Sequence, residues 1–209
     1  MCRLRQPARI FTLMALLPAT AWAQRITVDG RLSPAQTLAG PNYAITAGLG
    51  KQVGGNLFHS FGKFGLVQGE SATFSGPVSV TNVVGRVTGG AASSIDGAVR
   101  SSIVGANLYL INPSGIVFGP NATVNVSGAF HAATADYVRF ADGARFRATQ
   151  PEGSTLTSAA PAAFGFLNPM PAAITVNGAR LGPAPTIALT GGASWRPFRS
   201  KSDGGVSAE

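Results

Sequence analysis

Cysteine, charge and histidine are all scarce in this sequence, and each shortage excludes a class of protein. Cys2 is the single cysteine among 209 residues, so no disulfide can form within the chain. Only 11% of the residues are charged, and no basic stripe with interleaved aromatics supports binding to nucleic acid. The fold must therefore be stabilised by packing and hydrogen bonds, without covalent cross-links.

Patterns that carry catalysis or bind metals are also missing. His59 and His131 are the two histidines, no serine lies in a Gly-x-Ser-x-Gly elbow, and the carboxylates are dispersed. Gly48-Leu49-Gly50-Lys51 lacks the spacing of a phosphate loop and is expected to be an ordinary loop. We therefore expect both histidines to be strand residues, and a protein that is not an enzyme, with no catalytic residue, metal ligand or cofactor.

The first 23 residues have the pattern of a secretory signal peptide. Arg3, Arg5 and Arg9 precede an apolar run at residues 10–17, and Ala21-Trp22-Ala23 forms a small-x-small cleavage site. The run is shorter than the roughly 20 residues that span a bilayer, so a membrane anchor is the weaker alternative. We expect cleavage between Ala23 and Gln24, which lowers the formal net charge from +8 to +5 because the signal carries three basic residues and no acidic one.

The remaining sequence predicts an all-β protein. No window of 11 residues shows helical periodicity without Gly or Pro, whereas short apolar or alternating runs bounded by turn residues recur throughout. The candidate strands are Arg25 to Val28, Tyr43 to Thr46, Asn56 to Leu66, Ala72 to Phe74, Val78 to Val87, Asn107 to Ile111, Gly115 to Phe118, Thr123 to Val126, Ala129 to Ala132, Tyr137 to Phe140, Arg145 to Ala148, Ile174 to Val176 and Ile187 to Leu189.

Asx-Gly corners and one internal repeat bear on whether the chain forms a β-sandwich or a β-solenoid. The corners at Asp29-Gly30, Asp96-Gly97, Asp142-Gly143 and Asn177-Gly178 suit hairpins of a sandwich or corners of a β-solenoid. The stretch from Phe118 to Val126 aligns with Phe140 to Ala148 at a spacing of 22 residues, pairing Val124 with Phe146. Such a period is typical of one turn of a parallel β-helix and favours the solenoid, although one repeat alone leaves coincidence open.

The domain boundaries follow from composition. Residues 24–190 form one β domain, with an irregular excursion at 148–173 that Phe164 and Phe166 pack onto the core. Residues 191–209 lack strand signals and are expected to be a disordered tail.

Several segments in order carry a family resemblance. They are Gly55-Asn56-Leu57-Phe58-His59-Ser60-Phe61, Gly69-Glu70-Ser71-Ala72-Thr73-Phe74, Arg86-Val87-Thr88-Gly89-Gly90, Ser94-Ile95-Asp96-Gly97 and the stretch from Ala106 to Gly119, which contains Asn112-Pro113-Ser114-Gly115-Ile116. Together they resemble the N-terminal secretion domain of filamentous-haemagglutinin-type proteins, the exported partner in two-partner secretion. The Asn112 segment is similar to the Asn-Pro-x-Gly secretion motif of that family.

The resemblance implies a right-handed parallel β-helix with N-terminal capping strands. It also implies export to the periplasm of a Gram-negative-type bacterium and recognition by an outer-membrane β-barrel transporter of the Omp85 superfamily, through the transporter's periplasmic domains. The product would then fold at the cell surface or be released. Members usually continue for many hundreds of residues of adhesive repeats, so this chain is expected to be a short product whose adhesive role is in doubt.

The Asn112 motif also has a purely structural interpretation. Asn, Pro, Ser and Gly in this order favour a type I turn, in which Asn112 bonds the backbone ahead, Pro113 fixes φ and Gly115 closes the turn. The motif can serve as a corner, as a secretion signal, or as both.

Two other functions remain as alternatives. A stand-alone solenoid that binds carbohydrate at the cell surface would show aromatics along one face, and Tyr43, Tyr109, Tyr137 and Trp195 are the candidates. A β-helical polysaccharide-active enzyme would need clustered carboxylates. We expect a monomer whose further partner is a glycan or protein on a host or neighbouring cell.

Overall fold

The computed structural model describes residues 25–193 and 207–208, and this part of the chain is almost entirely β. The expected cleavage site between Ala23 and Gln24 lies outside the described residues, as does most of the expected tail. Two short 3-10 helices, η1 (Ala47–Leu49) and η2 (Pro151–Gly153), are the helical elements of the described part. No helix in it is long and apolar enough to cross a membrane.

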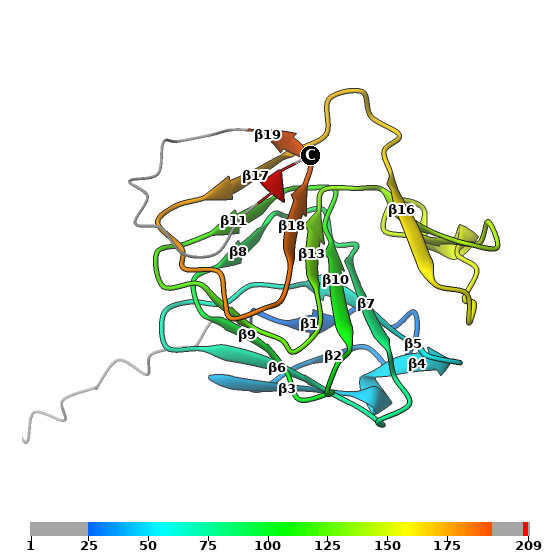
Figure 1. Ribbon diagram of the computed structural model, residues 1–209, viewed down its shortest axis with the longest axis horizontal. Coiled ribbons are helices and arrows are strands. Elements are labelled where there is room, and N and C mark those ends of the chain that lie inside the picture. Colours follow the sequence, from blue (N-terminus) through cyan, green and yellow to red (C-terminus); the bar gives the residue numbers. More distant parts are fainter. Residues whose placement is uncertain (1–24, 194–206, 209) are drawn as a thin grey trace, which may run out of the picture.

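The strands stack in parallel on three faces of a β-solenoid of about four turns. Face A consists of β5 (Asn56–Lys63), β7 (Asn82–Val87), β10 (Asn107–Ile111), β13 (Phe130–Ala133), β18 (Ile187–Thr190) and β20 (Ser207–Ala208). Face B consists of β3 (Asn42–Thr46), β6 (Ser71–Ser75), β9 (Ala98–Ser101) and β12 (Thr123–Asn125). Face C consists of β8 (Ser93–Ile95), β11 (Ile116–Phe118), β17 (Ala173–Val176) and β19 (Gly192–Ala193). In Figure 1 the turns follow one another from the blue strands at the bottom to the orange strands at the top.

One side of the strands on face A lines the interior of the solenoid. Leu57, Val83, Leu108, Phe130 and Ile187 occupy one register on successive strands of face A, and all are buried. Burying such a side chain contributes roughly 1.5–3 kcal/mol. Because the same position recurs on each turn, the interior is a stack of apolar columns, and the predicted parallel β-solenoid is confirmed.

Antiparallel strands cap the first turn, as the resemblance implied. Strand β1 (Thr27–Val28) pairs with β2 (Gln36–Thr37) and with the second half of β5, while β4 (Gly50–Val53) pairs with the first half of β5. The outer edge of β5 is therefore covered along most of its length, which protects it from pairing with another chain. The expected loop at Gly48-Lys51 is wrong in part, because Gly50 and Lys51 begin β4.

An excursion between β13 and β17 leaves the solenoid and covers the outer side of face A (Figure 1). It contains β14 (Tyr137–Phe140), β15 (Arg145–Arg147) and β16 (Pro161–Gly165), and β14 pairs antiparallel with both of the others. A second apolar core forms beneath it, where Phe58 on the outer side of β5 meets Phe140 and Phe146, with ring centroids 5.7 and 5.0 Å away. Face A is thus buried on both sides at its early strands.

The predicted 22-residue repeat is wrong, because its two segments do not stack on each other. Val124 lies on face B in register with Val99, whereas Phe146 lies in the excursion opposite Val138 of the antiparallel hairpin β14–β15. Both segments alternate apolar and polar residues with a glycine corner, and this local pattern is the same whether a strand stacks in parallel or pairs in a hairpin. Strands β5, β7, β10 and β13 of face A follow one another at spacings of 26, 25 and 22 residues, so a spacing of 22 does occur, but between β10 and β13 and not between the two aligned segments.

Further differences concern short strands with weak local signals. Strands β2, β8 and β9 were not expected, and the excursion contains the regular strand β16 where irregular structure was predicted. Phe164 is half-buried against the second core, but Phe166 is exposed, so the two do not form a packed pair. Within the expected disordered tail, β19 pairs with β17 and β20 with β18, while residues 194–206 and 209 lie outside the described part.

Candidate functional site

The secretion-motif segment forms the corner between β10 on face A and β11 on face C. The backbone N–H of Gly115 donates to the Asn112 carbonyl at 3.1 Å, and the N–H of Ser114 donates to the Asn112 side-chain Oδ1 at 2.9 Å. Gly115 has a φ of +112°, a backbone conformation that favours glycine. Asn112 therefore bonds the backbone ahead of it, as the sequence predicted.

Asn112 also joins its own corner to the corner one turn earlier. Its side chain is fully buried, and its Nδ2 donates to the Ala91 carbonyl and to the Ser93 Oγ, each at 2.9 Å. The N–H of Ser93 in turn donates to the Gly115 carbonyl at 3.0 Å. The sequence predicted one local hydrogen bond, but the cross-turn bonds depend on stacking that no local pattern reveals.

Burial divides the five motif residues into two groups. Asn112, Gly115 and Ile116 are buried, while Pro113 and Ser114 remain partly exposed. A partner that meets the folded domain can contact Pro113 and Ser114, whereas the Asn112 amide is accessible only when the corner is open.

The family-like segment from Asn56 to Phe61 makes up most of β5, and all six residues are buried. Leu57 and Phe61 point into the solenoid core, and Phe58 belongs to the second core under the excursion. Because β5 is buried on both sides, its polar residues Asn56, His59 and Ser60 are buried too, and the strand lacks the regular polar-apolar alternation of a half-exposed strand.

His59 lies between these residues without a hydrogen-bond partner for either ring nitrogen among the described residues. Its ring stacks near Phe61 and meets Phe74 edge-on, with centroids 5.9 and 5.6 Å away. Burial lowers the pKa of His59 to about 4, although the nearby backbone of Leu49 opposes part of this shift. His59 is therefore a neutral core residue of β5 at pH 7.

An asparagine ladder runs along the start of three successive strands of face A. The Nδ2 of Asn82 donates to the Oδ1 of Asn56, and the Nδ2 of Asn107 donates to the Oδ1 of Asn82, both at 3.0 Å. The excursion closes the ladder, because Asn56 Nδ2 donates to the carbonyls of Thr157 at 2.8 Å and Ala159 at 2.6 Å. The spacing of these three asparagines, each at the start of an apolar run, is the sequence signal that could have revealed the ladder.

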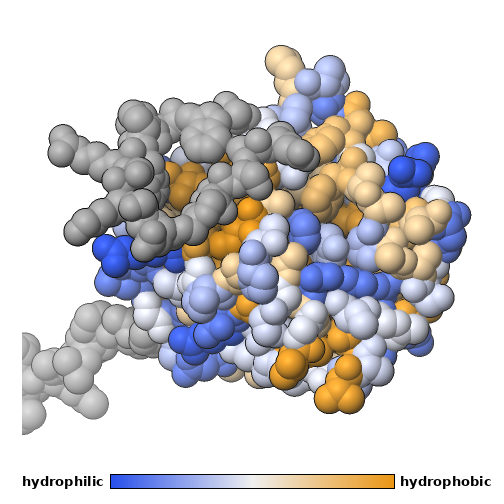
Figure 2. Space-filling view, in the orientation of Figure 1, coloured by the Kyte–Doolittle hydropathy of each residue, from blue (hydrophilic) through white to orange (hydrophobic). Residues whose placement is uncertain are grey.

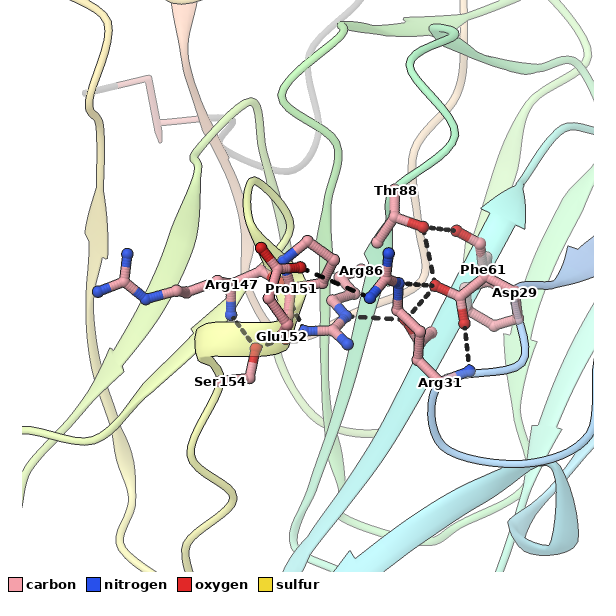
Figure 3. Close-up of polar contacts among 10 residues, drawn as sticks. Asp29, Arg31, Phe61, Arg86, Thr88, Arg147, Pro151, Glu152 and Ser154 are labelled. Atoms are coloured by element: carbon pink, nitrogen blue, oxygen red, sulfur yellow. Dashed lines mark hydrogen bonds and ion pairs between the residues drawn. The ribbon is translucent and has the colours of Figure 1, made fainter.

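Arg86 is the largest fully buried side chain, and it holds the excursion against the first turns (Figure 3). Its Nη1 donates to the Arg147 carbonyl at 2.5 Å and to the Ser154 Oγ at 2.6 Å, with a longer contact of 3.4 Å to the Pro151 carbonyl. The guanidinium carbon lies 4.2 Å from the centre of the Phe146 ring. Burial lowers the pKa of Arg86 to about 10, with Asp29 opposing that shift, so the side chain stays charged at neutral pH.

The same cation is linked to the N-terminal cap through Ser60. Arg86 Nε donates to Ser60 Oγ at 2.8 Å, and Ser60 Oγ donates to Asp29 Oδ2 at 2.6 Å. Asp29 also accepts from Thr88 Oγ1 at 2.8 Å and lies 3.5 Å from Arg31 Nε. One buried network therefore connects the cap, two strands of face A and the excursion.

Clustered ligand groups are not found in the described part of the chain. No three His, Cys, Asp or Glu residues there lie close enough together to hold a metal ion. The polar groups that are buried serve contacts between turns, caps and the excursion.

The described part of the chain is thus a capped parallel β-solenoid whose buried polar contacts join segments far apart in the sequence. The TPS secretion domain family matches residues 24–202, and the chain belongs to this family. Its domain is that of a two-partner secretion exoprotein, a class secreted across the outer membrane of Gram-negative bacteria.

A similar curated protein is the heme/hemopexin-binding protein of Haemophilus influenzae. The two share 34% identity over 79 residues, which is 38% of this chain and 8% of that protein. The chain thus matches less than a tenth of the length of that relative.

Proposed function

We propose that this chain is taken up as an extended polypeptide by an Omp85-type transporter, after its signal peptide has been removed in the periplasm, and that it folds into the solenoid at the cell surface. Family membership over residues 24–202 supports the secretion role. The single structural observation that carries the proposal is the burial of Asn112, since a partner that reads this side chain must meet it before the corner closes.

The distribution of polar partners supports the extended state before export. Asn56 and Arg86 lie in the first two turns, yet part of their hydrogen-bond partners lie 61 to 103 positions later in the sequence. A buried polar group without its partner costs about 1–3 kcal/mol, and more when it is charged. The early turns are therefore poorly stable by themselves, which favours an unfolded, export-competent chain until the excursion is available.

Secretion of matched variants tests the role of the motif. The full chain would be produced with its cognate transporter in a Gram-negative host, and the protein in the medium would be quantified. Asn112→Ala removes three side-chain hydrogen bonds from a buried site and should cost about 2–4 kcal/mol. Leu108→Ala, at a buried core position of the same turn, should cost about 2–5 kcal/mol and serves as the control.

Secretion of the two variants is compared at matched urea midpoints. We expect secretion of the Asn112→Ala variant to fall well below that of the Leu108→Ala variant, because only the former alters a residue read by the transporter. Equal secretion of the two would reduce the motif to a structural corner. Secretion that persists without the transporter would contradict the proposed route.

A further inference from the structure

A stack of two rings stands on the outer side of face A, in the later turns. Tyr109 of β10 and His131 of β13 occupy the same register, with ring centroids 4.5 Å apart and planes 5° from parallel. The next residue in this register is Ala188 of β18, whose methyl side chain leaves the other face of His131 without a ring against it. The column therefore ends in a gap about one strand spacing high, or about 4.8 Å.

The excursion turns this gap into a groove. Phe164 of β16 lies beside the stack, with ring centroids 6.4 Å from Tyr109 and 6.5 Å from His131. The groove has a volume of about 480 Å³ and is also lined by Phe166 and Thr190. Figure 2 shows apolar surface over the region that β16 occupies in Figure 1. This volume lies within the usual range for small-molecule sites.

The lining of the groove is amphipathic and uncharged. It contains no Asp, Glu, Lys or Arg. Burial lowers the pKa of His131 and raises that of Tyr109, so both rings are neutral at pH 7. No described residue forms a hydrogen bond with the Tyr109 hydroxyl or with either His131 nitrogen, so these groups remain available to a ligand beside the apolar ring faces.

We propose that this groove binds one neutral pyranose unit of an extracellular glycan, with the apolar face of the sugar against His131 above Ala188. A pyranose presents C–H groups on its face and hydroxyls at its rim, which matches stacked rings bordered by hydrogen-bonding groups. The uncharged lining disfavours acidic sugars, because a carboxylate would lose water without gaining a cation.

The order of assembly separates this ligand from the transporter. The groove requires β10, β13, β16 and β18 together, so it exists only after the chain has folded. Only the choice of a glycan over the transporter as the ligand rests on the proposed route of export. Sugar binding can be measured on purified protein whether or not that route is correct.

Saturation-transfer NMR on the purified mature chain tests the proposal, with lactose and cellobiose as probes. We expect transfer to at least one disaccharide, concentrated on the C–H groups of one sugar ring. Ala188→Phe places a ring in the gap and should weaken binding by at least about tenfold, as should His131→Ala, which removes the platform. Val104→Ala, at a position that is 87% exposed, should bind as the parent does.

Several results would overturn the proposal. One is the absence of transfer to either disaccharide, and another is binding that Ala188→Phe and His131→Ala both leave unchanged. Binding of p-cresol without binding of sugars would assign the groove to an aromatic side chain of a protein partner. Tighter binding of sialyllactose than of lactose would contradict the neutral ligand. If Ala188→Phe does not fold, His131→Ala still decides between these outcomes.

Discussion

Arg86 offers the sharpest test of how the excursion is held to the solenoid. The side chain is 1% exposed, and its guanidinium carries hydrogen bonds to Ser60, Arg147 and Ser154 at once. Replacing it with Met keeps a long apolar stem against Phe146 but removes every donor, whereas Ala also leaves a cavity.

The expected losses follow from these contacts. Arg86→Ala combines a large cavity with two carbonyls that lose their donor, and we expect unfolding to become easier by about 3–5 kcal/mol. Arg86→Met fills most of the space and removes the cost of burying a charge, so its loss should be about 1–3 kcal/mol. The difference between the variants measures packing, and the loss in Arg86→Met measures the hydrogen bonds net of the cost of burying the charge.

Urea unfolding of the purified chain from Gln24 onward gives both values. Arg100→Met is the matched control, since Arg100 is exposed on β9 and the same substitution there should change stability by no more than about 0.5 kcal/mol. Hydrogen exchange adds a local measurement. Amides at residues 145–159 should lose protection in Arg86→Met before those of β7 and β10, because the excursion is what Arg86 retains.

Two results would refute this reasoning. If Arg86→Met were as stable as the parent, the second apolar core alone would hold the excursion, as happens when buried ionic groups are replaced by hydrophobic ones in other proteins. If protection fell uniformly along the solenoid, Arg86 would act on global stability and would have no specific role at the excursion.

Two further predictions use the other buried polar groups. Since the pKa of His59 lies near 4 in the fold against an ordinary 6.5, the unfolded chain binds the extra proton, and stability should fall by up to about 3 kcal/mol as pH decreases from 6.5 to 4. Urea midpoints of His59→Leu should therefore decline less steeply with decreasing pH than those of the parent. Some decline should remain, because burial also lowers the pKa of the half-buried His131. A slope equal to that of the parent would contradict the burial argument. Asn82→Asp keeps the shape of the ladder but replaces a donor with a second acceptor facing Asn56. Calorimetry at pH 7 should therefore show that the free energy of unfolding falls by about 1–3 kcal/mol. An unchanged midpoint would mean that the ladder contributes little to stability.

The fold class was predictable because its signals are local. Short apolar runs and Asx-Gly corners reflect the backbone of each strand and turn, and they were assigned without knowing what lies alongside. The same corners did not reveal the connectivity: Asp96-Gly97 and Asn177-Gly178 turn between faces of the solenoid, whereas Asp29-Gly30 and Asp142-Gly143 lie in hairpins. The backbone requirement is alike in both settings, so the local sequence cannot separate them.

The candidate site, too, could be predicted only as far as its local contacts. The Asn112 turn and its bond to the backbone ahead follow from four consecutive residues, and they are present. Its bonds to Ala91 and Ser93 depend on which corner stacks below, and the role of Arg86 depends on residues more than 60 positions away. Interactions of that range are set by the order of turns and by the inserted excursion, which no single segment encodes.

The position of the excursion in the chain gives these long-range bonds a common consequence. The excursion accepts hydrogen bonds from Asn56 at the end of the asparagine ladder and from Arg86, and it buries the outer side of β5 and β7. It nevertheless follows the third turn in sequence. A chain that emerges from its N-terminus therefore leaves Asn56 and Arg86, in the first two turns, without part of their hydrogen-bond partners until residue 159 has appeared. A chain that emerged from its middle would gain the excursion earlier. If the N-terminus emerges first in the proposed export, this late closure favours completion of export before folding. Variants of the excursion should then separate folding from transport.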